Sequence, residues 1–226
     1  MPSPLLTNVV RGRQQPDRLL LLIHGKGADE HDLEGIIPIL DPEGRFVTVL
    51  PRAPLAFEPG WEWYRTEGIP KGGAELVSSV DALDDLLDAC CAEYGFDRSQ
   101  AIVAGFSQGC AVTLALGLRR SGRPRPAGLL GMSGFLPERP ELEYDFTAAP
   151  PVFIQHGSFD PLISPEQGRR SVTRLAAEGV PVIHREYPMA HQVSMESARD
   201  AMVWMSLLLA GERPSEPVPD FGATPS

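Results

Sequence analysis

The stretch AIVAGFSQG, residues 101–109, decides the fold of this chain. Residues 101–104 form a short apolar run, which predicts a strand buried on both faces. Gly105, Ser107 and Gly109 then make the pattern G-x-S-x-G, and an apolar helical pattern follows over residues 112–118. A strand, a sharp turn and a helix in this order indicate that the pattern is a nucleophile elbow.

The elbow has a specific physical requirement. A serine at a strand-to-helix corner has a strained backbone, so the residues on both flanks must lack bulk. The same corner aims the hydroxyl out of the sheet and sets backbone N–H groups beside it at the helix N-terminus. The alternative is a glycine-rich turn with an incidental serine, and the flanking strand and helix favour the elbow.

The composition is that of a globular domain with an acidic balance. The chain has 226 residues, which suits one α/β domain, and its formal net charge is −10. That charge argues against a nucleic-acid partner and against stable association with an anionic membrane surface. No run of roughly twenty apolar residues is present, and no secretory signal is visible at the start. We therefore expect a cytoplasmic protein.

The cysteines agree with a reducing compartment. Cys90, Cys91 and Cys110 fall on predicted helices, and the first two are adjacent, which makes them poor disulfide partners. No C-x-x-C motif offers a zinc site.

Apolar strands alternate with helical patterns along the chain. Strands are predicted at 19–23, 46–50, 101–104, 127–132, 151–155 and 182–187, with helices at about 33–40, 74–94, after the elbow, and at 165–177 and 193–209. This alternation predicts a single-domain α/β fold, with a mostly parallel sheet and helices on both faces. We expect the domain over 18–210, an extension or edge strand at 1–17, and a disordered tail at 211–226.

The predicted helix at 74–94 is amphipathic, with an acidic outer face. That face carries Asp81, Asp84, Asp85 and Asp88. We interpret the aspartates as a solvated helix face and not as a metal site.

The first predicted strand, 19–23, ends in the glycine-rich loop His24-Gly25-Lys26-Gly27. Two glycines let this loop approach a neighbouring loop closely, and we expect the N–H of Lys26 to point at the serine. A phosphate-binding loop is the competing interpretation, but its motif is absent.

A proline-rich aromatic loop follows the strand at 46–50. It contains Trp61, Trp63 and Tyr64. These residues either wall a hydrophobic substrate site or pack down on the core from a surface loop, and the sequence leaves both alternatives open.

A serine hydroxyl is a weak nucleophile unless a neighbouring base takes its proton. In this type of fold the partners follow in the order serine, acid, histidine. Downstream of Ser107, His184 lies inside a predicted strand, and His156 precedes every convincing acid. His191 alone lies in a loop just past the carboxyl end of a strand, where sites of open α/β sheets form. His191 is therefore the predicted base.

The predicted acid lies after the preceding strand. Asp160 occupies that position, whereas Asp145 lies in a loop with no strand leading into it. Taken singly, Asp160 could be a turn residue before Pro161, and His191 could be a surface histidine. Three such side chains in the expected order at strand ends favour Ser107, Asp160 and His191 as a catalytic triad.

Several stretches together resemble the phospholipase/carboxylesterase family, the α/β-hydrolase group that includes the acyl-protein thioesterases. They are LLIHGKGA (21–28), GFSQG (105–109), MSGFLP (132–137), HGSFDP (156–161) and AH (190–191). The resemblance implies Ser107 as the nucleophile, His191 as the base and Asp160 as its orienter. It also implies an oxyanion hole made by the backbone N–H groups of Lys26 and Gln108. Thioesterases of this group usually carry an apolar residue where Lys26 stands.

These observations predict a serine carboxylesterase that hydrolyses short to medium acyl (thio)esters through an acyl-enzyme intermediate, without a cofactor or a metal. Its partner is then a small-molecule ester, and a homodimer is one of the oligomeric states left open. Two rival interpretations are a catalytically silent ligand-binding protein of the same fold and an enzyme like dienelactone hydrolase. An intact triad counts against the first, and a serine where the second uses cysteine counts against that one.

Overall fold

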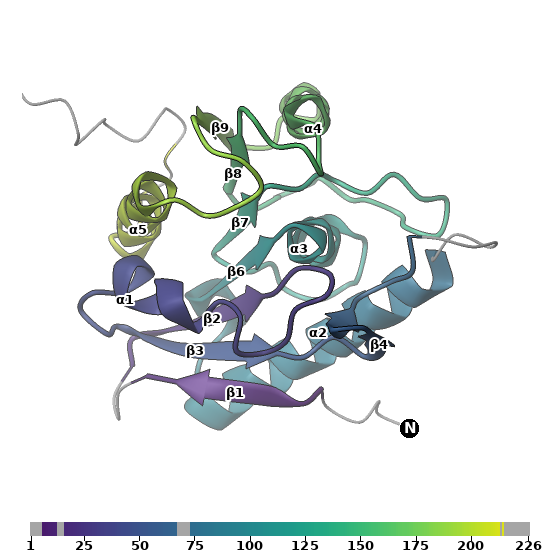
Figure 1. Cartoon of the computed structure of the whole chain (residues 1–226). Coiled ribbons are helices and arrows are strands. Elements are labelled where there is room, and N and C mark those ends of the chain that lie inside the picture. Colours follow the sequence, from purple (N-terminus) through teal and green to yellow (C-terminus); the bar gives the residue numbers. More distant parts are fainter. Residues whose placement is uncertain (1–5, 13–15, 67–72, 213, 215–226) are drawn as a thin grey trace, which may run out of the picture.

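A twisted, mostly parallel sheet forms the centre of the molecule (Figure 1). The computed structural model describes residues 6–12, 16–66, 73–212 and 214. Within them, seven strands form one sheet in the order β1 (Asn8–Arg11), β3 (Phe46–Pro51), β2 (Arg18–Ile23), β6 (Ala101–Phe106), β7 (Gly128–Met132), β8 (Val152–Gly157) and β9 (Val182–Tyr187). Only β1 pairs antiparallel to its neighbour. The α/β fold predicted from the sequence is confirmed.

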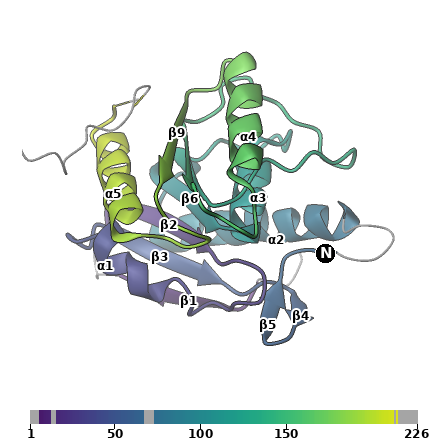
Figure 2. The same ribbon diagram turned by 45° about the horizontal axis from the view of Figure 1, so that its top comes forward.

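Helices cover both faces of this sheet (Figures 1 and 2). On one face lie α2 (Gly73–Tyr94), α3 (Gln108–Leu118) and α4 (Pro165–Ala177); on the other lie α1 (Ile37–Leu40) and α5 (Met195–Leu209). Alternation along β2 explains the two layers, because Leu19 and Leu21 join the first apolar core and Leu20 joins the second. Short 3-10 turns precede α1 (Glu34–Ile36) and β6 (Arg98–Gln100).

The acidic face of α2 is less exposed to solvent than the sequence predicted. Asp84 is fully buried and forms ion pairs with Arg98 and Arg119. The other three aspartates of this face are paired with Arg119 or Arg123, at N–O distances of 2.6–2.9 Å. The expectation of a solvated face was wrong for Asp84, because two arginines from other segments compensate the charge that burial would otherwise penalise.

The aromatic loop after β3 contains a small hairpin instead of irregular chain alone. Its strands are β4 (Leu55–Phe57) and β5 (Gly60–Glu62). The backbone of Trp61 pairs with the glycine-rich loop after β2, since Gly27 N–H donates to its carbonyl at 2.8 Å and its own N–H donates to Ala28 at 2.9 Å. The hairpin is therefore fixed beside the end of β2.

Parts of both ends of the chain lie outside the residues that the structure describes. Strand β1 forms one edge of the sheet within the predicted N-terminal extension. The tail predicted at 211–226 lies outside the described residues except for 211, 212 and 214. Among the described helices, none combines the length and the apolar composition needed to cross a bilayer.

The corner between β6 and α3 leaves no room for a side chain at Gly109. A Cβ atom there would lie 2.2 Å from the carbonyl oxygen of Ile23 and 2.6 Å from that of His24. We expect Gly109→Ala to lower the free energy of unfolding by about 2 kcal/mol or more, since backbone must move to admit the methyl group. Urea unfolding measures this change. In the control Gly35→Ala, the new Cβ meets no atom within 4 Å, and we expect a change of about 0.5 kcal/mol or less. Equal losses in the two variants would contradict the crowding argument.

Candidate active site

Ser107 occupies the corner where β6 ends and α3 begins. Its backbone has φ 56° and ψ −118°, a conformation that L-residues rarely adopt. Its N–H donates to the carbonyl of Met132 at 2.8 Å, and this bond anchors the corner to the end of β7. A Cβ at Gly105 would lie 2.2 Å from the carbonyl oxygen of Gly109. The two glycines of the motif are thus required by the close approach of backbone to backbone.

The structure brings the three predicted triad residues into one hydrogen-bonded chain. His191 Nε2 lies 2.9 Å from Ser107 Oγ, and His191 Nδ1 lies 2.7 Å from Asp160 Oδ2. Asp160 follows β8 and His191 follows β9, so both reach Ser107 from the carboxyl ends of neighbouring parallel strands. The ring of Phe106 lies against the imidazole with 4.8 Å between centroids. This arrangement holds the imidazole between the Ser107 hydroxyl and the Asp160 carboxylate.

The Asp160 carboxylate is buried, and hydrogen bonds from neighbouring groups satisfy its oxygens. Its Oδ1 accepts hydrogen bonds from the N–H groups of Leu162 and Ile163, both at 2.9 Å. Burial raises the pKa of this carboxyl, but the hydrogen bonds from His191 and from the two amides outweigh it and hold the pKa below its ordinary value. Asp160 therefore stays ionised at neutral pH and accepts the Nδ1–H of His191.

The other downstream histidines lie apart from the serine. His184 lies on β9, where burial lowers its pKa, and its Nε2 is 3.9 Å from a carboxylate oxygen of Glu186. His156 lies behind the acid: its Nε2 is 2.9 Å from the carbonyl oxygen of Ile163 and 3.5 Å from Asp160 Oδ2. His156 therefore contacts Asp160 and not Ser107.

The glycine-rich loop after β2 lies directly against Ser107. A Cβ at Gly25 would lie 3.1 Å from the Cβ of Ser107. His24 holds the loop, because its Nδ1 lies 2.6 Å from the Gly25 carbonyl and its Nε2 accepts the N–H of Ala53 at 3.1 Å. These partners fit a neutral ring with the proton on Nδ1, and burial lowers the pKa of His24 accordingly.

Lys26 and Gln108, predicted as backbone donors, both line the cavity that contains Ser107. Neither backbone N–H donates a hydrogen bond to another residue in the described part of the chain. The Gln108 side chain has a role that the sequence did not indicate. Its Oε1 accepts the N–H of Trp63 and its Nε2 donates to the carbonyl of Tyr64, both at 2.7 Å. The residue after the nucleophile thus ties the aromatic loop to the elbow.

The Lys26 ammonium contacts a hydroxyl, a carboxylate and an aromatic ring. It lies 2.9 Å from Thr66 Oγ1, 3.4 Å from Glu62 Oε2 and 4.2 Å from the ring centroid of Phe57. These contacts hold the β4–β5 hairpin against the loop after β2.

The cavity over Ser107, which His191 also lines, has a volume of about 620 Å³, and a second cavity of about 390 Å³ lies beside it. Of the three aromatic residues predicted to wall it, only Tyr64 does so. Trp63 is fully buried, with its indole N–H donating to the His24 carbonyl at 2.9 Å. Trp61 packs against Arg52, whose guanidinium lies 4.9 Å from the indole ring.

The apolar wall of the triad cavity comes instead from residues that the sequence reasoning missed. They are Phe57, Phe106, Phe135, Leu162 and Ile163. Phe57 and Phe106 are the last residues of β4 and β6, and the other three lie in the segments after β7 and β8. Phe135 belongs to the MSGFLP stretch that already stood out in the sequence.

Comparisons with known proteins agree with this geometry. A family model described as Phospholipase/Carboxylesterase matches residues 6–209. The chain is 28% identical over 244 residues to acyl-protein thioesterase 1 of Mycosarcoma maydis, covering 93% of this chain and 100% of that protein. It is 24% identical over 211 residues to lysophospholipase-like protein 1 of Mus musculus, covering 85% of this chain and 87% of that protein.

A solved structure shows the same fold. The carboxylesterase of Bacillus cereus superposes with a TM-score of 0.79 at 22% identity, covering 91% of this chain and 96% of that one. The family resemblance carried by the motifs is confirmed, since the family match spans almost the whole described chain. The chain belongs to the phospholipase/carboxylesterase family, and it is a carboxylic ester hydrolase of the α/β-hydrolase fold.

Proposed function

We propose that this protein is a serine carboxylesterase that hydrolyses short to medium acyl (thio)esters through an acyl-enzyme intermediate. The observation that carries the proposal is the hydrogen-bonded chain from Ser107 through His191 to Asp160. A nucleophile, a base and an orienting acid at hydrogen-bond distances are what acyl transfer requires.

The first half of the reaction forms the acyl-enzyme. Ser107 Oγ attacks the acyl carbon while His191 Nε2 takes the hydroxyl proton. Asp160 accepts the Nδ1–H of the resulting imidazolium and stabilises its charge without taking the proton. His191 then gives its proton to the departing alcohol or thiol as the bond from the acyl carbon to that group breaks. In the second half, water attacks the acyl-enzyme with the same base, and Ser107 Oγ leaves with the proton.

The negative charge that develops on the acyl oxygen needs donors. The backbone N–H groups of Lys26 and Gln108 are the proposed oxyanion hole, supported by their position at the cavity and by their lack of another described acceptor. Loss of one such donor in a comparable enzyme costs about 3–4 kcal/mol of transition-state stabilisation.

The size and lining of the cavity support acyl groups of short to medium length. Its aromatic and aliphatic wall buries an acyl chain, and each buried methylene adds about 0.8 kcal/mol until the chain outgrows the wall. The wall ends in solvent, since Leu162 is 74% exposed at its rim. Activity should therefore rise with acyl length and then decline.

The chemistry of the cysteines counts against a cysteine nucleophile. Cys110 is fully buried, and burial raises the pKa of its thiol to about 12. A thiol in that state supplies almost no thiolate at neutral pH. The elbow position belongs to Ser107, which disfavours a site like that of dienelactone hydrolase. A silent binding protein is disfavoured because all three triad hydrogen-bonding groups are present and aligned.

The nucleophile can be tested by covalent labelling. We expect Ser107→Ala to fold like the wild type and to lose both ester hydrolysis and labelling by a serine-directed fluorophosphonate, because alanine has no hydroxyl to react with either reagent. Intact-protein mass spectrometry measures the label, and circular dichroism checks the fold. Stoichiometric labelling of the folded variant would remove Ser107 as the nucleophile.

Two histidine variants test the base. We expect His191→Ala to lower kcat by several orders of magnitude, since the serine proton then has no acceptor. His184 lies away from Ser107 on β9, so His184→Ala should leave kcat near the wild-type value and alter mainly the unfolding midpoint. Steady-state kinetics and thermal unfolding of both variants separate the effects. A large kcat loss in a folded His184→Ala protein, with His191→Ala near normal, would contradict this assignment.

The position of the apolar wall can be tested by acyl-length profiles. We expect Phe135→Ala to weaken the preference for longer acyl chains, by about fourfold in kcat/KM for each methylene that loses its contact. Trp61→Ala is the matched aromatic control, because its ring lies against Arg52 and away from the cavity. A series of aryl esters of graded acyl length gives the two profiles. A shifted profile in Trp61→Ala beside an unchanged one in Phe135→Ala would overturn this placement of the wall.

A further inference from the structure

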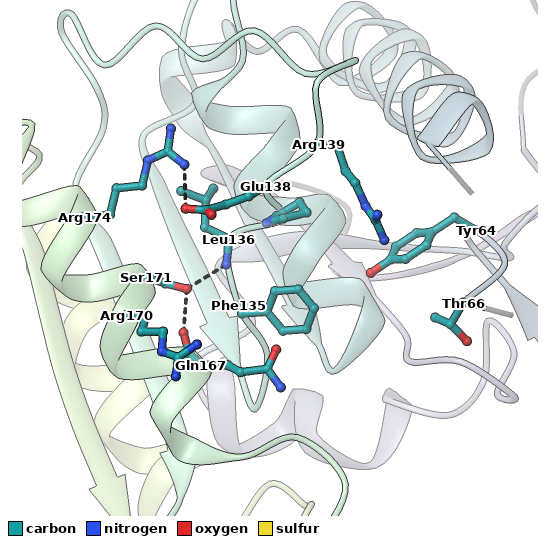
Figure 3. Close-up of a pocket in the computed structure, with 11 residues that line it drawn as sticks. Tyr64, Thr66, Phe135, Leu136, Glu138, Arg139, Gln167, Arg170, Ser171 and Arg174 are labelled. Atoms are coloured by element: carbon teal, nitrogen blue, oxygen red, sulfur yellow. Dashed lines mark hydrogen bonds and ion pairs between the residues drawn. The ribbon is translucent and has the colours of Figure 1, made fainter. Parts of the chain in front are cut away.

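A second cavity, of about 390 Å³, adjoins the one that contains Ser107 (Figure 3). The two cavities share four lining residues, Tyr64, Thr66, Phe135 and Gln167. The remaining wall comes from residues 136–139 and from one side of α4. A substrate placed with its scissile carbonyl at Ser107 can therefore extend past these shared residues into the second cavity.

The charge of the second cavity is unlike that of the whole chain. The formal net charge of the chain is −10, yet three arginines and a single glutamate line this space among the residues that the structure describes. Arg174 is already neutralised, because it pairs with Glu138 at 2.7 Å and packs over the ring of Tyr144. Arg170 has only a loose neighbour, with its Nε 3.8 Å from a carboxylate oxygen of Glu166.

Arg139 is the distinctive group. It is half-buried, and within the described residues no carboxylate lies at ion-pair distance from its guanidinium. The side chain reaches into the cavity beside Tyr64 (Figure 3). A guanidinium that is partly removed from water, with no carboxylate partner in the described part of the chain, is poised to bind an anion from solution.

Neutral donors stand next to this charge. The Tyr64 phenol lies in the wall between the cavities, and burial raises its pKa to about 12, so its hydroxyl keeps its proton. The amide side chain of Gln167 also lines both cavities and has no hydrogen-bond partner among the described side chains and backbone groups. Planar guanidinium with neutral donors at its side suits a carboxylate, which accepts two parallel hydrogen bonds.

We propose that Arg139, with Arg170 opposite, binds a carboxylate carried by the ester substrate, so that the preferred substrates are anionic esters with a free carboxylate beyond the scissile bond. This inference rests on the proposed esterase function and narrows its substrate class. The apolar surface of Phe135 then contacts the spacer between ester and carboxylate, and Tyr64 lines the passage.

Paired substrates test the inference on the wild-type protein. One set consists of 4-nitrophenyl half-esters of dicarboxylic acids of graded length, each compared with the same compound whose free carboxyl is capped as a methyl ester. A second set carries the carboxylate on the phenol of the leaving group, again with its methyl-capped counterpart. We expect at least one anionic ester to exceed its capped partner roughly tenfold in kcat/KM, as befits a charge-assisted contact. The ratio should shrink at high ionic strength.

Three arginine variants locate the contact. Arg139→Gln should reduce the anionic-to-capped ratio about tenfold, and Arg139→Lys should restore part of it, because an ammonium keeps the charge but not the paired donors. Arg199→Gln is the matched control: this arginine is exposed on α5, on the opposite face of the sheet. It removes the same formal charge and should leave the ratio unchanged.

The outcomes separate the two levels of inference. Equal kcat/KM for anionic and capped esters in both sets, or an unchanged ratio in Arg139→Gln, would overturn the carboxylate site while hydrolysis itself continued. An equal loss in Arg199→Gln would also overturn it, since the effect would then be one of net charge. Failure of the proposed function shows differently, as hydrolysis of the capped esters that persists in Ser107→Ala.

Discussion

Backbone-to-backbone contact at one corner of the sheet is the constraint on which the site depends. The turn from β6 into α3 is so tight that a Cβ atom at Gly105 would meet the backbone of Gly109. It also runs so close to the end of β2 that a Cβ atom at Gly109 would meet the carbonyl oxygens of Ile23 and His24. At this corner Ser107 has a positive φ, and the loop after β2 lies against it. The same local packing therefore positions the proposed nucleophile and the two proposed oxyanion donors.

The parallel sheet supplies the other half of the arrangement. In a parallel sheet, loops that follow neighbouring strands emerge at the same edge, so Asp160 and His191 meet although they are far from Ser107 in the sequence. The amides of Leu162 and Ile163 fix the carboxylate before it receives the imidazole N–H. Fixing the acid removes the freedom that His191 would otherwise have to turn away from the serine.

The features of the fold and the site that could be predicted are those that short stretches of sequence encode. Strand ends, the glycines of the elbow and the order of acid and histidine are properties of short stretches. The sheet could therefore be predicted from the sequence, and so could the proposed set of Ser107, Asp160 and His191, whose side chains meet in the structure. The roles of the tryptophans could not, because two aromatic residues in one loop carry no sign of direction. Only the packed structure shows that the Trp63 indole donates to the His24 carbonyl and is thereby removed from the cavity.

Ion pairs between residues far apart in the chain could not be predicted from the sequence either. The burial of Asp84 depends on Arg98 and Arg119, and an aspartate on a helical acidic face has the same pattern whether or not such partners arrive. The charge of the second cavity is a case of the same kind. Its arginines stand on two separate segments, residues 136–139 and α4, which come together only in the folded chain.

The proposed reacting groups and the proposed carboxylate site thus have different structural origins in this protein. The proposed triad stands at and after strand ends that the whole sheet holds in place, whereas the cavity beside it is lined mainly by α4 and by the segment after β7. Changes in those two elements can alter charge and shape around a substrate without moving Ser107, His191 or Asp160. A negatively charged chain repels anionic esters at long range, so selection of such substrates would have to come from close contact with Arg139 and not from steering by net charge.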